Sequence, residues 1–246
     1  MFANRIKKYG GTGGGSPGGI PMDIEFNGVD QYLHTVNSVG DTNTTAWAVS
    51  VWVLWFLDQT PSVSDYKYIW QNRDSLTTGN ESAGLAVNTF SRSLFIRRNS
   101  QWVEFTLTNT EIEADVWHHL VLNGTATQVQ IYVDAAFKGG LTDSIMNLRS
   151  FSCFAGSPFP TITRGDNMAG LIDDTRLFGR SLGQADVDEL YANRNLPIAT
   201  PPEYLQAFLD EGPADSPAVG AGSIIDTSAA SNNLTPVNSP IYRLTA

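Results

Sequence analysis

The chain has 246 residues, of which 41% are hydrophobic and 16% charged, and its formal net charge is −10 at pH 7. This composition excludes a disordered chain, which would be poorer in apolar residues, and a coiled coil, which would be dominated by Ala, Glu, Lys, Leu and Arg. The negative charge argues against nucleic acid as a partner, because phosphate binding needs a basic surface. The length allows a large core and is compatible with one domain or two.

The single cysteine, Cys153, excludes a disulfide within the chain. No stretch approaches the about 18 consecutive apolar residues of a membrane-spanning helix. The N-terminal residues turn to glycine where a signal peptide would carry its apolar stretch. We therefore expect a protein that stays in a cytosol or leaves it by another route, and that inserts into no membrane.

Residues 1–21 differ from the rest of the chain, with seven glycines, three basic residues and no acid. A glycine-rich segment costs too much backbone entropy to become ordered by itself. The segment is either a flexible tail or an arm that becomes ordered on a neighbouring subunit. For the second case, we predict assembly contacts by Arg5, Lys7, Lys8 and Tyr9.

Short apolar runs separated by Gly, Asn, Asp, Ser and Pro predict strands over most of the chain to residue 179. Alternating apolar residues in 102–108 are typical of a half-buried strand, whereas 46–57 is apolar on both faces and predicts a central strand covered on both sides. The predicted strands are 23–26, 31–36, 46–57, 66–72, 82–90, 93–99, 102–108, 116–123, 127–134, 151–156 and 170–179.

One amphipathic helix is predicted over 184–194, because its apolar residues recur at helical spacing: Val187, Leu190 and Tyr191. Ser181, followed three residues later by Gln184, is typical of a capping box. Further strands are predicted at 203–210 and within 224–235. We therefore divide the chain into an N-terminal arm (1–21), a β-sandwich (22–195) and a C-terminal segment (196–246) that completes the sandwich.

Three segments carry a family resemblance: IEFNGVDQYL, VWHHLVLNGTATQVQIYVD and GLIDDTRLFGRSLGQADVDELYANR. In this order they resemble the laminin-G-like, concanavalin A-like jelly-roll family over about residues 22–195. The resemblance implies an all-β fold, an antiparallel jelly-roll β-sandwich with one short helix. Ala135 follows Asp134 where the family usually has a glycine, so the turn there is altered.

Two further segments, AFLDEGPADSP and DTSAASNNLT, are similar to the usual prelude of such domains but follow the helix. This permuted order resembles jelly rolls of bacteriophage and marine viral particles. It implies that the last strands of the chain lie beside the first.

Neighbouring residues on a strand point to opposite faces, so His118 and His119 cannot bind one metal together. The same argument separates Asp173 from Asp174, one of which we expect to fix a loop by accepting backbone hydrogen bonds. Structural roles are favoured for all four residues.

Three catalytic motifs are absent: the sequence has no E-x-D-x-x-E strand, no H-E-x-x-H and no P-loop. The densest acids, Asp186, Asp188 and Glu189, are typical of the solvated face of the helix. Cys153 lies in a run typical of a core strand. We therefore predict that the chain is not an enzyme.

The resembled family often binds sugars or calcium. Sugar binding needs exposed aromatic rings beside polar groups, which makes five residues candidates: Tyr66, Trp70, Asn72, Arg73 and Trp102. Burial in the core is the favoured alternative for the aromatic ones. Asp58, Asp134 and Asp166 are candidate Ca²⁺ ligands, although no loop has a dense series of acids, and no cofactor is predicted.

The main functional prediction is a virion structural protein, a capsid decoration, head-fibre or tail-fibre subunit assembled in the host cytoplasm. In it, the arm would contact other virion proteins or further copies of the chain, as a homo-oligomer. The alternative is a carbohydrate-binding adhesin that recognises a glycan on the host surface. A glycan-cleaving enzyme is the third hypothesis and requires a pair of carboxylates about 5–10 Å apart.

Overall fold

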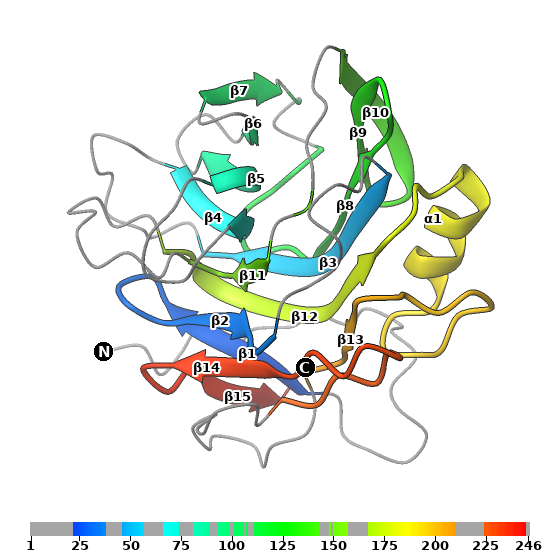
Figure 1. Cartoon of the computed structure of the whole chain (residues 1–246). Helices are drawn as coiled ribbons and strands as arrows, with labels where there is room; N and C mark the ends of the chain where they lie inside the picture. The colour runs from blue at the N-terminus through cyan, green and yellow to red at the C-terminus, as the bar shows by residue number, and fades with distance from the viewer. Residues whose placement is uncertain are drawn as a thin grey trace.

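The computed structural model describes residues 22–37, 46–56, 66–73, 81–88, 93–98, 101–105, 107, 111–142, 148, 150–156, 167–209 and 224–244. Within these ranges the chain forms two antiparallel sheets packed face to face, with a helix outside one of them (Figure 1). The predicted all-β sandwich is therefore confirmed.

The first sheet, sheet A, has the order β10-β9-β8-β3-β12-β1-β15, and β13 also pairs with β12. Its strands are β1 (Met22–Asn27), β3 (Trp47–Trp55), β8 (His118–Gly124), β9 (Gln128–Val133), β10 (Ala136–Thr142), β12 (Ala169–Phe178), β13 (Leu205–Ala207) and β15 (Ile241–Leu244). The second, sheet B, has the order β14-β2-β11-β4-β5-β6-β7. Its strands are β2 (Tyr32–Thr35), β4 (Tyr66–Arg73), β5 (Glu81–Asn88), β6 (Ser93–Arg98), β7 (Gln101–Phe105), β11 (Phe151–Phe154) and β14 (Leu234–Val237).

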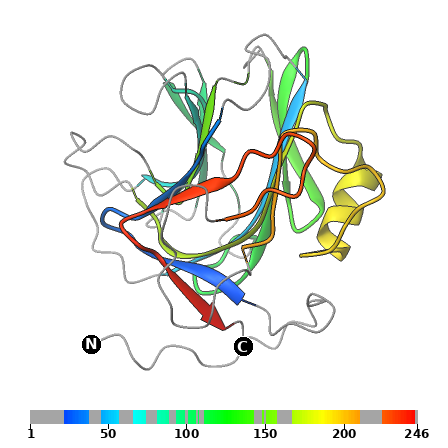
Figure 2. The same cartoon turned by 60° about the horizontal axis from the view of Figure 1, so that its bottom comes forward.

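Strand β3 shows how the sequence builds the layers. Its odd-numbered residues, from Trp47 to Trp55, lie in the core between the two sheets. Ala48 lies on the opposite, outer face of sheet A and packs against Val187 and Leu190 of α1 (Gln184–Ala192). Figure 2 shows α1 beside sheet A on the side away from sheet B. This double coverage explains why β3 is apolar on both faces, as the sequence predicted.

The last strands of the chain lie beside the first ones. β14 pairs with β2, and β15 pairs with β1, both antiparallel. The sequence analysis missed β10 and β15 as strands. β10 is an edge strand with mostly exposed side chains, and its register shifts between Phe137 and Gly139, which removes the regular alternation.

The helix begins later than its predicted cap. Gly183 is the N-cap residue, and its backbone N–H donates to the Asp186 carboxylate at 2.9 Å. The Ser181 hydroxyl instead donates to the carbonyl of Gly124 at 2.7 Å, so the capping box predicted from Ser181 and Gln184 is wrong. In the described part of the chain, no helix is long and apolar enough to cross a membrane.

The segment DTSAASNNLT forms a turn around Asp226, which is buried. The carboxylate of Asp226 accepts hydrogen bonds from the backbone N–H groups of Gln206 at 2.7 Å and Ser228 at 2.8 Å. It also accepts the N–H of Asn232. This turn therefore joins β13 to the residues that lead into β14, a structural role for the motif.

Candidate functional site

Three of the predicted sugar-binding residues lie on β4 with described side chains, and all three are buried. Trp70 is fully buried, its ring lies 5.6 Å from that of Trp47, and its indole N–H donates to the Ser152 hydroxyl at 3.3 Å. Asn72 is also buried and donates to the carbonyl of Phe151 at 3.1 Å. Both side chains belong to the interior of the sandwich, so Trp70 offers no exposed ring to a sugar.

Arg73 is buried as well. Its guanidinium donates to the side-chain oxygen of Gln71 at 2.9 Å, and the Gln71 amide donates to the carbonyl of Gly156 at 2.7 Å. Tyr66 and Trp102 pair through their backbones with Asn88 and Arg97, but their side chains lie outside the described part of the structure. The role of the five candidates in glycan binding therefore stays a prediction.

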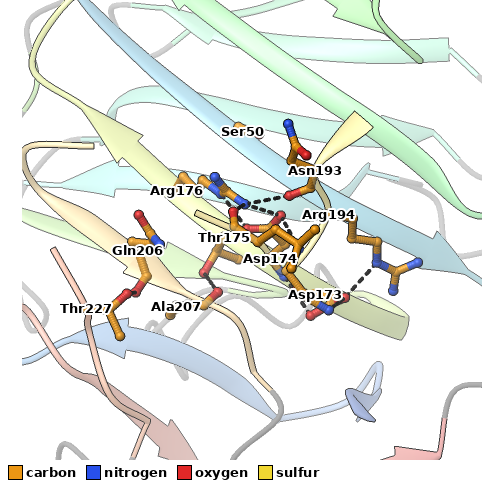
Figure 3. Close-up of polar contacts among 12 residues, drawn as sticks. Ser50, Asp173, Asp174, Thr175, Arg176, Asn193, Arg194, Gln206, Ala207 and Thr227 are labelled. Carbon is orange, nitrogen blue, oxygen red and sulfur yellow. Dashed lines mark hydrogen bonds and ion pairs between the residues drawn. The ribbon is translucent and has the colours of Figure 1, made fainter. Parts of the chain in front are cut away.

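The outer face of sheet A carries a group of charged residues beside α1, which we call the Asp–Arg network: Asp23, Asp173, Asp174, Arg176 and Arg194. Figure 3 labels the last four of them. All are buried except Arg194, which is partly exposed.

Its most buried part is the ion pair of Asp174 and Arg176. The guanidinium donates to both carboxylate oxygens, at 2.5 and 2.7 Å, and Arg176 has no exposed surface. The same side chain donates to the carbonyls of Asn193 at 3.1 Å and Leu196 at 2.9 Å. Asp174 accepts the backbone N–H of Asn195 at 2.9 Å. The pair on β12 thus holds the turn that follows α1, as expected for a loop-fixing aspartate.

Arg194 forms the second part of the network. It donates to Asp173 on β12 at 2.7 Å and to Asp23 on β1 at 2.8 Å. The Asn195 amide also donates to Asp173, at 2.7 Å. Burial raises the pKa of Asp173 well above its usual value, the charges of Asp23 and Asp174 raise it further, and Arg194 opposes this rise.

The prediction that Asp173 and Asp174 have separate surroundings is wrong. The register between β12 and β3 shifts between Asp173 and Arg176, and Asp174 has a φ of 42°. This irregularity breaks the alternation of a regular strand, so both carboxylates reach the turn after α1.

Next to Arg194 lies a row of three aromatic side chains, Trp52, Trp117 and Tyr191, which we call the aromatic platform. The guanidinium carbon of Arg194 lies 4.0 Å from the ring centroid of Trp117 and 5.1 Å from that of Trp52. The ring of Tyr191 is stacked on Trp52, with centroids 5.4 Å apart and planes 18° apart. Tyr191 is 42% exposed, and both tryptophans are partly exposed.

His119 lies under this row, stacked on Trp52 at 5.2 Å. Burial lowers its pKa to about 3, so the imidazole is neutral at pH 7. Its Nε2 lies 2.8 Å from the Ser50 hydroxyl, but its Nδ1 has no hydrogen-bond partner among the described residues. The pair lacks a carboxylate that orients the imidazole and is closed to solvent, which does not suit a nucleophilic site.

His118 points to the other face, where it stacks on Trp55. Its Nε2 accepts the backbone N–H of Glu113, so its Nδ1 carries the proton and donates to Asp134 at 2.8 Å. Asp134 also accepts the N–H of His119 at 2.8 Å. Both oxygens of this candidate Ca²⁺ ligand thus hold the β8–β9 hairpin.

The other two candidate ligands, Asp58 and Asp166, lie outside the described residues. The described residues contain no cluster of three or more His, Cys, Asp or Glu side chains suited to a metal. Cys153 is buried on β11.

The sequence analysis singled out none of five site residues of this region: Asp23, Trp52, Trp117, Arg176 and Arg194. The partners of Arg194 are distant in sequence, since Asp23 lies 171 positions away, and no local pattern marks it. Tyr191 was found as part of the apolar stripe of α1, but Val187 and Leu190 are the buried members of that stripe. Tyr191 instead lies at the margin of the helix, over Trp52.

A profile of the concanavalin A-like lectin/glucanases superfamily (Laminin_G_3) matches residues 27–188, more than half of the chain. The chain therefore belongs to this family. No curated protein sequence matches the chain.

Two solved structures share the fold. A Bacteroides ovatus protein whose name proposes carbohydrate binding is 14% identical, with a TM-score of 0.67 over 93% of this chain. This chain spans 61% of the length of that protein. A heptameric SAP-like pentraxin from Limulus polyphemus is 13% identical, with a TM-score of 0.57 over 88% of this chain and 94% of its own.

Proposed function

We propose that this chain is a non-catalytic carbohydrate-binding jelly roll, which was the alternative in the sequence analysis. The observation that carries the proposal is the membership of residues 27–188 in a superfamily of lectins and glucanases. The name of the Bacteroides ovatus protein supports the binding role.

The carboxylates of the Asp–Arg network do not suit glycoside hydrolysis. Glycoside hydrolysis needs two carboxyl groups placed about 5–10 Å apart around a bound sugar. Asp23, Asp173 and Asp174 are close together, but each is buried and hydrogen-bonded to an arginine. They are therefore shielded from a sugar at the surface.

The proposal is tested by applying the purified chain to a printed array of neutral and sialylated oligosaccharides and then incubating it with each bound glycan. We expect retention of at least one glycan class and no release of reducing sugar ends. An array without signal would refute carbohydrate binding, and reducing ends above those of a heat-denatured control would refute the non-catalytic part.

The virion role stays a prediction. The arm with Arg5, Lys7, Lys8 and Tyr9 lies outside the described residues, and the relatives named above give no support for a virion protein. Homo-oligomerisation also stays a prediction. A virion subunit that binds glycan would satisfy both hypotheses, and deletion of residues 2–21 separates them, since it should abolish incorporation into particles and leave array binding unchanged.

A further inference from the structure

The aromatic platform differs from the buried tryptophans of the described core in being partly open to solvent. Trp47, Trp55 and Trp70 have no exposed surface, whereas Trp52 and Trp117 are partly exposed and Tyr191 is 42% exposed. A tyrosine that served only to close the core under α1 would be buried as Val187 and Leu190 are.

The platform is built by three separate segments that meet on the outer face of sheet A. Trp52 lies on β3, opposite Asp173 of β12 and His119 of β8 in the strand register. Trp117 directly precedes β8, and Tyr191 comes from the last turn of α1. Sugar-binding sites combine such partly exposed rings with a small number of polar groups that fix the orientation of the ligand.

We propose that the aromatic platform binds a neutral saccharide, with a sugar ring stacked on the exposed ring of Tyr191. This inference rests on the proposed carbohydrate-binding function and assigns its site. No described residue forms a hydrogen bond with the Tyr191 hydroxyl in the structure. In the complex, this hydroxyl therefore donates a hydrogen bond to the sugar or accepts one from it.

The charges around the platform favour a neutral ligand over an acidic one. Arg194, the cation nearest to the rings, is already paired with Asp23 and Asp173. The whole chain has a net charge of −10. An anionic sugar would thus be repelled by the net charge of the chain and would find Arg194 already paired with carboxylates.

The network also makes the platform rigid before the ligand arrives. Arg194 is held by two carboxylates and lies between the rings of Trp52 and Trp117. Arg176 holds the turn that carries Arg194 through the carbonyls of Asn193 and Leu196. A site whose side chains are already fixed loses little conformational entropy on binding.

The test measures the affinity of the full chain and its variants for the strongest neutral oligosaccharide on the array, by isothermal titration calorimetry. Tyr191→Ala is the main variant, because Tyr191 is exposed and its removal leaves the core intact. Trp117→Ala and Tyr191→Phe accompany it. Phe137→Ala is the matched control: Phe137 is 52% exposed on β10 of the same sheet. Trp102→Ala tests the predicted site on sheet B. Urea midpoints confirm that each variant is folded.

We expect Tyr191→Ala to weaken binding about tenfold or more, which is about 1.4 kcal/mol. Trp117→Ala should do the same, Tyr191→Phe should keep most of the affinity, and Phe137→Ala and Trp102→Ala should leave it unchanged. Sialylated forms of the same oligosaccharide should bind more weakly than the neutral form.

Three results would overturn the assignment while leaving carbohydrate binding in place: unchanged affinity of Tyr191→Ala, loss of binding in Trp102→Ala or Phe137→Ala instead, or preference for the sialylated form. A wild-type chain that binds no oligosaccharide would overturn both proposals.

Discussion

The buried ion pair of Asp174 and Arg176 makes a strong prediction about stability. Replacing Arg176 with Met keeps much of the side-chain volume but removes the charge. Asp174 would then remain buried, with the backbone N–H of Asn195 as the remaining donor to its carboxylate among the described residues. The carbonyls of Asn193 and Leu196 would lose their donor. Breaking a buried pair in this way costs about 3–5 kcal/mol. Since domains have a total stability of about 5–15 kcal/mol, this loss is large.

The double variant Asp174→Asn/Arg176→Met tests the reason for that loss. Asparagine tolerates the positive φ of 42° at position 174 and still accepts the Asn195 N–H, but it carries no charge. We therefore expect the double variant to be more stable than Arg176→Met alone, because no unpaired charge is buried. Arg180→Met is the control, since Arg180 is partly exposed and its pair with Asp186 should contribute about 1 kcal/mol or less.

The assay is urea unfolding at pH 7 followed by tryptophan fluorescence, with linear extrapolation to water and a check that the slope m is unchanged. The reasoning fails if Arg176→Met costs no more than Arg180→Met. It also fails if the double variant is no more stable than Arg176→Met alone, which would mean that the unpaired charge of Asp174 is not the cause of the loss.

Four further predictions use the same or simple measurements. Burial depresses the pKa of His119 from 6.5 to about 3. The neutral imidazole therefore contributes fully to the free energy of unfolding above pH 6.5, and up to about 5 kcal/mol is lost as pH falls toward 3. His119→Phe should reduce this loss when urea unfolding is measured between pH 6.5 and 3. For Asp173 the dependence on pH has the opposite sign. Because its pKa is raised in the folded protein, its contribution to the free energy of unfolding falls as pH rises from 3.8. Asp173→Asn should remove this fall. Gly170→Ala should lower stability by about 1–3 kcal/mol, because the new Cβ would lie 2.8 Å from the Cα of Trp55. Cys153, which is buried, should not react with a thiol reagent until urea unfolds the chain, whereas rapid labelling of the native protein would show that β11 opens.

Most of the fold could be predicted from the sequence, because buried strands leave short apolar runs bounded by Gly, Asn, Asp, Ser and Pro. Strands β3, β8 and β9 are central or well covered, and their runs were found within a few residues. Strand β10 could not be found this way, because it lies at the edge of sheet A and buries too little to leave a pattern.

The candidate site could be predicted only in part. Alternation correctly separated His118 from His119 because β8 is regular there. The same rule failed at Asp173 and Asp174, where the register shift cannot be recognised from one sequence. Trp70 satisfies the chemical requirements for sugar stacking, but its burial depends on Trp47 of the opposite sheet, a tertiary contact that no local pattern shows.

The Asp–Arg network and the aromatic platform are linked through α1, and this link decides how binding experiments must be interpreted. Val187 and Leu190 are the described buried residues of the helix, which corresponds to roughly 3–6 kcal/mol of apolar burial and fixes no particular orientation. The directional contacts come from Arg176 and Arg194, which hold the turn after the helix and thereby position Tyr191 over Trp52. A variant of either arginine would therefore weaken glycan binding without any contact between arginine and sugar. Tyr191→Ala changes the platform without changing the network, so a loss of affinity there, at an unchanged urea midpoint, identifies a contact with the ligand.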